Sequence, residues 1–134
     1  MKVIMSIGNP IKSDDNIGNI VLEKIETDAL KIRAETSPEN FIDRMKGCDE
    51  IIILDALQFG GDVGEVKVFE LYDVEDRLLS THSIPIELLK KFFPNSKIKV
   101  IGIQPKNLDF GEEISKGLEV KMDEIVKKVT LFSK

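Results

Sequence analysis

Among the side chains that can transfer protons or bind a metal, four in the first 82 residues stand at the predicted ends of strands or starts of helices. They are Asp14, Asp15, Asp55 and His82, the last being the single histidine among 134 residues. Two carboxylates and one imidazole form an O/O/N donor set, which can hold a borderline divalent ion such as nickel or zinc while leaving coordination positions open. The set can act only if the fold brings these side chains together.

The acidic pair lies in a connection that is longer than its neighbours require. The apolar run at 2–7 predicts a buried strand that stops at Gly8, and apolar residues recur at helical spacing over 16–27. A strand can reach the next helix in roughly 2–6 residues, so the intervening loop carries surplus length and charge. Asp15 or Asn16 could also serve simply as the helix N-cap, and this alternative stays open.

The rest of the chain alternates strands with helices. Strands are predicted at 30–34, 50–55, 65–71 and 97–103, and helices at 38–46, 85–93 and 113–131, with an irregular segment at 72–82. Because the turn at 59–64 is too short for a crossover helix, the strand after it should run antiparallel to the strand before it. The order predicts one domain, 1–134, folded as a three-layer α/β/α sandwich with a mostly parallel five-stranded sheet and one antiparallel edge strand.

Parallel strands explain how distant residues can share one site. Ligands of such sheets bind beyond the carboxyl ends of the strands, where both the first loop and Asp55 are expected. His82 precedes the helix that starts at Pro85 and leads into the last strand, and Gln104 follows that strand. Both should therefore lie at the same end of the sheet, beyond the carboxyl ends of its parallel strands, which we call the rim. Asp55 could instead hydrogen-bond loop amides, and a lone histidine is more often structural than a ligand.

Composition narrows the class of partner. Nineteen Lys and Arg residues against 24 Asp and Glu give a formal net charge of -5, and without a basic stripe or aromatic ladder we expect no nucleic-acid partner. No apolar stretch approaches the roughly 20 residues that span a bilayer, so we expect no membrane insertion. The single cysteine, Cys48, excludes an internal disulfide, favours the cytoplasm and is expected to be buried as a small hydrophobe.

The common catalytic signatures are absent. The chain contains no HExxH helix, Walker loop, GxSxG elbow or CxxC pair. The one histidine belongs with the acidic set rather than with an evident serine or cysteine nucleophile, so a triad enzyme is not expected.

Several sequence blocks, in this order and spacing, closely resemble the hydrogenase maturation proteases. The blocks are Gly8-Asn9-x-x-x-x-Asp14-Asp15-x-x-Gly18, the apolar strand ending in Asp55, Thr81-His82-x-x-Pro85 and Gly102-Ile103-Gln104-Pro105. A further block, Ser37-Pro38-Glu39-Asn40, resembles the branch that processes formate-hydrogenlyase-type large subunits. The resemblance extends from about residue 3 to about residue 130.

The resemblance implies a function and assigns residues to it. Members of this family are endopeptidases that remove a C-terminal extension from the large-subunit precursor of nickel-iron hydrogenases after nickel insertion. On the matching positions, Asp15, Asp55 and His82 would be the metal-binding and catalytic set. The nickel would be carried by the precursor, although other divalent ions can occupy such a site. Asp15 stands where other members carry glutamate, so a shorter acid must reach the ion here.

Other residues of the same blocks would support this set. We expect Asp14, Asn9 and Gln104 to position it. The acidic-Gly-Gly run that many members use in selecting the cleavage site is replaced around 33–36, where Glu35 could act from a shifted position. We expect a metal-assisted or carboxylate-assisted water to attack the peptide bond, without a covalent intermediate.

Two alternatives belong to other functional classes. A metal-dependent maturation chaperone would bind the precursor without cutting it. A receiver-like signalling domain also combines an acidic pair after the first strand with an aspartate ending the third. In this chain, however, a long loop separates the acids from the first strand, and Gln104 precedes Pro105 where a receiver would place lysine.

Overall fold

The computed structural model describes residues 1–77, 84–111 and 113–134. Within these residues a five-stranded sheet forms the centre, in the order β2-β1-β3-β5-β4. The strands are β1 (Lys2–Ile7), β2 (Leu30–Glu35), β3 (Glu50–Ala56), β4 (Val66–Glu70) and β5 (Lys97–Ile103). The pairs β1–β2, β1–β3 and β3–β5 are parallel, whereas β4 pairs with β5 in the antiparallel direction. The predicted mixed sheet with an antiparallel edge strand is confirmed.

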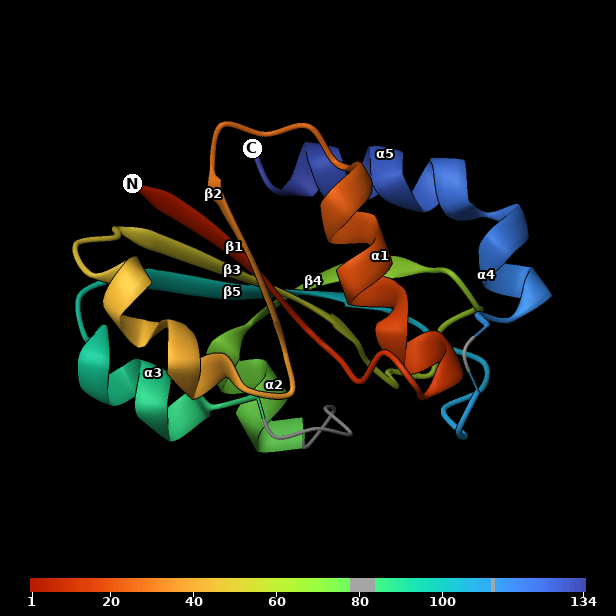
Figure 1. Cartoon of the computed structure of the whole chain (residues 1–134), viewed down its shortest axis with the longest axis horizontal. Coiled ribbons are helices and arrows are strands. Elements are labelled where there is room, and N and C mark those ends of the chain that lie inside the picture. The colour runs from red at the N-terminus through yellow and green to blue at the C-terminus, as the bar shows by residue number, and fades with distance from the viewer. Residues whose placement is uncertain (78–83, 112) are drawn as a thin grey trace.

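Helices cover both faces of this sheet (Figure 1). One face carries α1 (Ile17–Lys24), α4 (Lys116–Val120) and α5 (Met122–Phe132). The other carries the 3-10 helix η2 (Pro38–Met45), α2 (Leu71–Arg77) and α3 (Ile86–Phe92). A short 3-10 helix, η1 (Ser13–Asn16), leads into α1. The arrangement is the predicted three-layer α/β/α sandwich.

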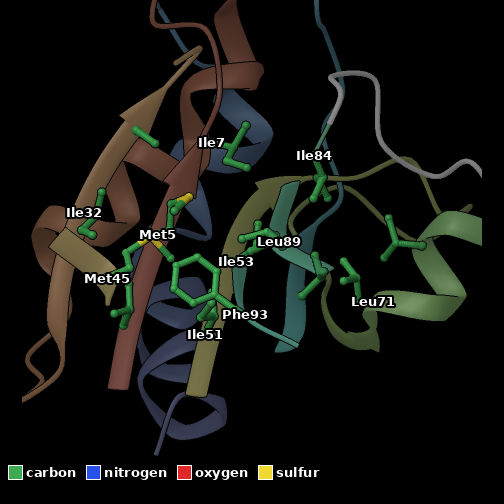
Figure 2. Packing of buried hydrophobic residues seen from close by; sticks show 14 of the residues in the cluster. Met5, Ile7, Ile32, Met45, Ile51, Ile53, Leu71, Ile84, Leu89 and Phe93 are labelled. Carbon is green, nitrogen blue, oxygen red and sulfur yellow. The ribbon is translucent and has the colours of Figure 1, made fainter. Parts of the chain in front are cut away.

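The central strand β3 is buried on both faces, as its continuous apolar run predicts. Ile51 and Ile53 pack into the cluster on the α3 side, and Figure 2 shows them among the side chains of that cluster. Ile52 and Leu54 pack into the cluster on the α1 side. Since side chains alternate along a strand, Asp55 projects to the same side as Ile53.

Strand β4 has the predicted direction and edge position, and its neighbour in the sheet is β5. It runs antiparallel to β3, yet β5 lies between the two, and β4 pairs with β5 from Val66 opposite Ile103 to Glu70 opposite Lys99. The turn at 59–64 therefore carries the chain past the position that β5 fills.

The prediction of an irregular segment at 72–82 is wrong for its first half, because residues 71–77 form α2. Leu71 and Val74, three positions apart, lie on one face of this helix and are buried in the α3-side cluster. The short helix thus packs its apolar side on the sheet.

The predicted helix at 113–131 consists of two helices that meet at Lys121. The Lys121 N–H donates to the carbonyl of Leu118, three residues back, and its Nζ donates to the carbonyl of Val63 at 2.8 Å. This tight turn holds the helix junction against the turn that precedes β4. The predicted helix at 38–46 is present as the 3-10 helix η2, with three residues per turn rather than the 3.6 of an α-helix.

Two further predictions concern the environment of the chain. Cys48 is buried, as predicted, with its Sγ 3.9 Å from the Oγ of Ser96. Among the helices of the described ranges, none has the length and apolar character needed to cross a membrane.

Candidate functional site

The carboxyl ends of β1, β3 and β5 lie side by side at the rim of the sheet. Ser6 of β1 pairs with Leu54 of β3, and Asp55 pairs with Gly102 of β5. The loop after β1 turns back into α1 at this rim (Figure 1). The first loop, Asp55 and the end of β5 therefore share one rim, as the alternation of strands and helices predicts.

The helical segment that carries the acidic pair lies directly against the end of β3. A Cβ atom at Gly18 would stand 2.7 Å from the carbonyl oxygen of Leu54, closer than such atoms approach in proteins. Only glycine at this position allows α1 to pack so near the strand, and η1 contacts β3 as well. The segment that holds Asp15 thus adjoins the strand that holds Asp55.

Asp15 is buried, with 1% of its surface exposed. Its Oδ2 accepts a hydrogen bond from the backbone N–H of Asn9 at 2.9 Å. Gly8 has φ +152°, and a Cβ there would lie 2.1 Å from the Asp15 carbonyl oxygen. Of the two residues predicted as possible N-caps, Asn16 occupies the N-cap position of α1, without a capping hydrogen bond from its side chain, and Asp15 does not. The chain leaving β1 therefore folds closely around Asp15.

Asp14 is also fully buried, but its carboxylate is engaged by a distant loop. Oδ2 accepts hydrogen bonds from the N–H groups of Lys106 (2.9 Å) and Asn107 (2.8 Å), and Oδ1 accepts one from Ser115 (2.6 Å). Hydrogen bonds to a charged group are the strong ones. Asp14 therefore ties the first loop to the 106–115 loop.

Asp55 is fully buried near the end of β3. Every other residue of 51–56 is apolar, and burying a carboxylate among apolar side chains costs stability unless it is compensated. Positions that break the local pattern in this way are expected at functional sites. Asp55 therefore stands where the sequence predicts a functional carboxylate.

His82, the third member of the predicted metal set, lies outside the described residues. Ile84, the first described residue after it, is buried in the cluster on the side of the sheet to which Asp55 projects. Within residues 1–77, 84–111 and 113–134, no three His, Cys, Asp or Glu side chains are grouped to hold a metal ion. The described part of the site thus consists of Asp15 and Asp55 with their surroundings.

Gln104 organises the loop between β3 and β4. Its Oε1 accepts hydrogen bonds from the N–H groups of Phe59 (2.9 Å) and Gly61 (3.2 Å), and its Nε2 donates to the Oε1 of Gln58 (3.3 Å). Its backbone N–H donates to the carbonyl of Glu65 at 2.9 Å. The side chain is thereby committed to shaping the loop that leaves Asp55.

Glu35 lies at the end of β2, at the same rim. It has φ +54°, and its carbonyl accepts a hydrogen bond from Gly8 N–H at 3.0 Å. Its carboxylate accepts one from the Arg33 Nε at 2.8 Å. Burial by itself would lower the pKa of Arg33, but hydrogen bonds to Glu23 and Glu35 outweigh it and the pKa is raised. Glu35 is thus near the first loop and paired with a guanidinium.

A buried polar network that sequence reasoning missed fixes the path from β1 to α1. Ser6 Oγ donates to Asn19 Oδ1 at 2.8 Å, and Asn19 Nδ2 donates to the Gly8 carbonyl (3.0 Å) and to Asn16 Oδ1 (2.9 Å). The available signal was an asparagine within the apolar stripe of the helix and a serine within an apolar strand. The network positions the loop that carries Asp15.

Comparison with known proteins gives the same assignment as the motifs. Residues 22–131 match the sequence model of a family described as hydrogenase maturation protease. The chain is 34% identical to the "Putative hydrogenase maturation protease MJ0631" of Methanocaldococcus jannaschii, with 92% of this chain and 83% of that protein aligned. It is 26% identical to the Hydrogenase 3 maturation protease of Escherichia coli K12, over 81% of this chain and 75% of that one.

Solved structures have the same fold. The crystal structure of a NiFe hydrogenase maturation protease HycI from Thermococcus kodakarensis superposes with a TM-score of 0.78 at 26% identity, over 97% of this chain and 90% of that chain. The solution structure of the endopeptidase HycI from Escherichia coli gives 0.83 at 20% identity, over 100% and 92%. With the family match covering most of the chain, these findings show that the protein belongs to the hydrogenase maturation protease family and is a peptidase.

Proposed function

We propose that this peptidase removes the C-terminal extension of a nickel-iron hydrogenase large-subunit precursor after nickel has been inserted. The name of its Escherichia coli relative, a Hydrogenase 3 maturation protease, supports a hydrogenase subunit as the substrate. The observation that carries the proposal is the packing of η1 against the end of β3, which sets two buried carboxylates, Asp15 and Asp55, at one rim. The cytoplasm is the proposed compartment, where a thiol such as Cys48 stays reduced.

The nickel ion belongs to the substrate in this proposal. Asp15 and Asp55 supply carboxylate oxygens and His82 supplies an imidazole nitrogen, and this donor set suits nickel and other divalent ions. An ion that the precursor already holds would accept these groups as additional ligands. A loaded precursor would therefore bind more tightly than an empty one, so that nickel insertion is checked before cleavage.

Hydrolysis requires that a water oxygen attack the scissile carbonyl carbon and that the departing amine receive a proton. A carboxylate at the rim can accept the proton of the attacking water and pass it to the amine. The ion of the substrate can polarise the carbonyl as a Lewis acid.

Cys48 precedes β3 and thus lies at the opposite end of this strand from Asp55, so it is not available as a nucleophile. Rapid-quench mass spectrometry should detect no acyl-enzyme, and a trapped adduct would contradict this mechanism.

Nickel dependence separates this function from the chaperone alternative. Purified protein is incubated with nickel-loaded and nickel-free precursor, and the intact mass of each precursor is followed. We expect the loaded precursor to lose its C-terminal extension and the nickel-free precursor to keep it. Stable binding without any loss of mass would favour a chaperone, and equal cleavage of both precursors would contradict nickel recognition. Membership of a peptidase family argues against the receiver-like alternative, which would require magnesium-dependent phosphorylation of Asp55.

A further inference from the structure

Two residues with exposed apolar side chains stand on neighbouring segments beside the proposed catalytic rim. Ile11 is 54% exposed and Phe110 is 76% exposed. Lys12 and Gly111 form a parallel β-bridge, and the Gly111 N–H donates to the Ile11 carbonyl at 2.9 Å. These contacts bring together segments that are about a hundred residues apart in the sequence. We call Ile11, Lys12 and Phe110 the rim platform.

Buried groups hold the platform in place. Asp14 anchors the 106–115 loop through three backbone N–H groups, as described above. Ser13 adds a hydrogen bond from its N–H to the Gly111 carbonyl at 2.6 Å and another from its Oγ to the Glu113 carbonyl at 2.8 Å. A surface fixed before a ligand arrives loses little conformational entropy on binding. The platform is therefore suited to binding rather than being an arbitrary loop tip.

Lys12 also contacts the exposed aromatic ring. Its Nζ lies 5.1 Å from the centroid of the Phe110 ring, within the range of a cation–π interaction. This contact holds the ring beside the first loop. Val120, Leu131 and Phe92 are exposed as well, but they stand on separate helices, and single exposed apolar side chains are ordinary in soluble proteins.

The position of the platform indicates what covers it. A peptidase binds its substrate as a polypeptide that extends on both sides of the scissile bond. Ile11 and Asp15 are four positions apart in the sequence, a span of at most about 14 Å of extended chain. We infer that the rim platform binds an apolar side chain of the precursor within about four residues of the scissile bond and thereby helps to select the cleavage position. This inference rests on the endopeptidase function proposed above.

Steady-state cleavage of nickel-loaded precursor tests the inference with the variants Ile11→Ser, Phe110→Ser and the double variant. We expect KM to rise about tenfold in the double variant, the change expected when one buried apolar contact is lost. The kcat should stay within about twofold, because the groups that carry out the reaction are unchanged. Phe110→Leu keeps an apolar side chain and should retain a KM near that of the wild type.

Phe92→Ser and Val120→Ser remove comparable exposed apolar surface elsewhere and should leave KM unchanged. Thermal unfolding of each variant reports whether the fold is retained. An unchanged KM in the folded double variant would overturn the platform while leaving the endopeptidase function intact. If the wild type fails to cleave the precursor, both proposals fall. A wild-type dimer that the double variant splits into monomers, seen by sedimentation, would assign the surface to self-association and overturn the inference.

Discussion

Asp14 and Asp15 are adjacent, identical in chemistry and both buried, yet their neighbours give them different roles. Three backbone N–H groups of the 106–115 loop bind the carboxylate of Asp14. Asp15 instead accepts a hydrogen bond from within its own loop, from Asn9. The sequence singled out the pair and suggested Asp15 as the ligand. It could not show where the Asp14 carboxylate binds, because the donors lie more than ninety residues further along the chain and are backbone groups.

Asp14→Asn is expected to destabilise the protein. An amide offers only one acceptor oxygen, so its NH₂ group would face a backbone N–H donor. Losing one or two charge-assisted hydrogen bonds should lower the free energy of unfolding by about 2–4 kcal/mol. Urea unfolding measures this change. Asp43→Asn makes the same substitution at an exposed position and should stay within about 0.5 kcal/mol. Equal stabilities of the two variants would show that the Asp14 contacts contribute little.

Gly8→Ala tests the close approach of the first loop to Asp15. The added Cβ would lie 2.1 Å from the Asp15 carbonyl oxygen, so the loop must move, at an expected cost of about 3 kcal/mol or more. Gly60→Ala is the matched control, since Gly60 also has positive φ but no atom lies within 4 Å of the added Cβ. Backbone strain alone should cost it about 1 kcal/mol. Thermal unfolding that ranks Gly60→Ala as the less stable variant would contradict this account of the loop.

At the level of elements, the position of α1 brings the candidate site together. The apolar period of the sequence predicted this helix, but not how near it lies to β3. That distance is set by Gly18 against the carbonyl of Leu54 and by the network of Ser6 and Asn19. Such contacts depend on the strand order, which periodicity alone does not determine.

Gly18→Ala has two opposing effects on the stability of the protein. Alanine raises helix propensity by about 1 kcal/mol relative to glycine. The contact of 2.7 Å with a backbone oxygen cannot be relieved by a side-chain rotation, so α1 and η1 should shift away from β3. We expect a net loss of about 1–3 kcal/mol in chemical unfolding, together with slower cleavage of the precursor.

Gly117→Ala in α4 is the control for this substitution. Its Cβ would meet only the Val63 side chain, at 3.2 Å, which can move by a few tenths of an ångström. This variant should be as stable as the wild type or slightly more so. A Gly18→Ala variant that is equally stable and fully active would show that the close packing of α1 does not position the site.

The failed predictions at 72–77 and at 113–131 have tertiary causes. Helix α2 depends on Leu71 and Val74 docking on the sheet rather than on any long apolar period. The junction between α4 and α5 depends on Lys121 reaching Val63, a contact made in the folded chain alone. Both results show tertiary contacts deciding where a helix exists or ends.

At the level of the whole molecule, parallel strand order is what makes distant acids neighbours. The alternation of strands and helices was enough to predict that the first loop, Asp55 and Gln104 meet at one rim, because parallel strands share the direction of their carboxyl ends. It was not enough to place β5 between β3 and β4, because that choice depends on packing between segments far apart in the chain.

Removing the charge of Asp55 is the sharpest test of whether this rim is the active site. Asp55→Asn keeps the size of the side chain but removes its charge, so the protein should stay folded by circular dichroism and lose at least about 100-fold in the single-turnover rate of cleavage of nickel-loaded precursor. The exposed control Asp43→Asn should cleave at the wild-type rate. Cleavage by folded Asp55→Asn at the rate of Asp43→Asn would contradict the assignment of this rim as the active site.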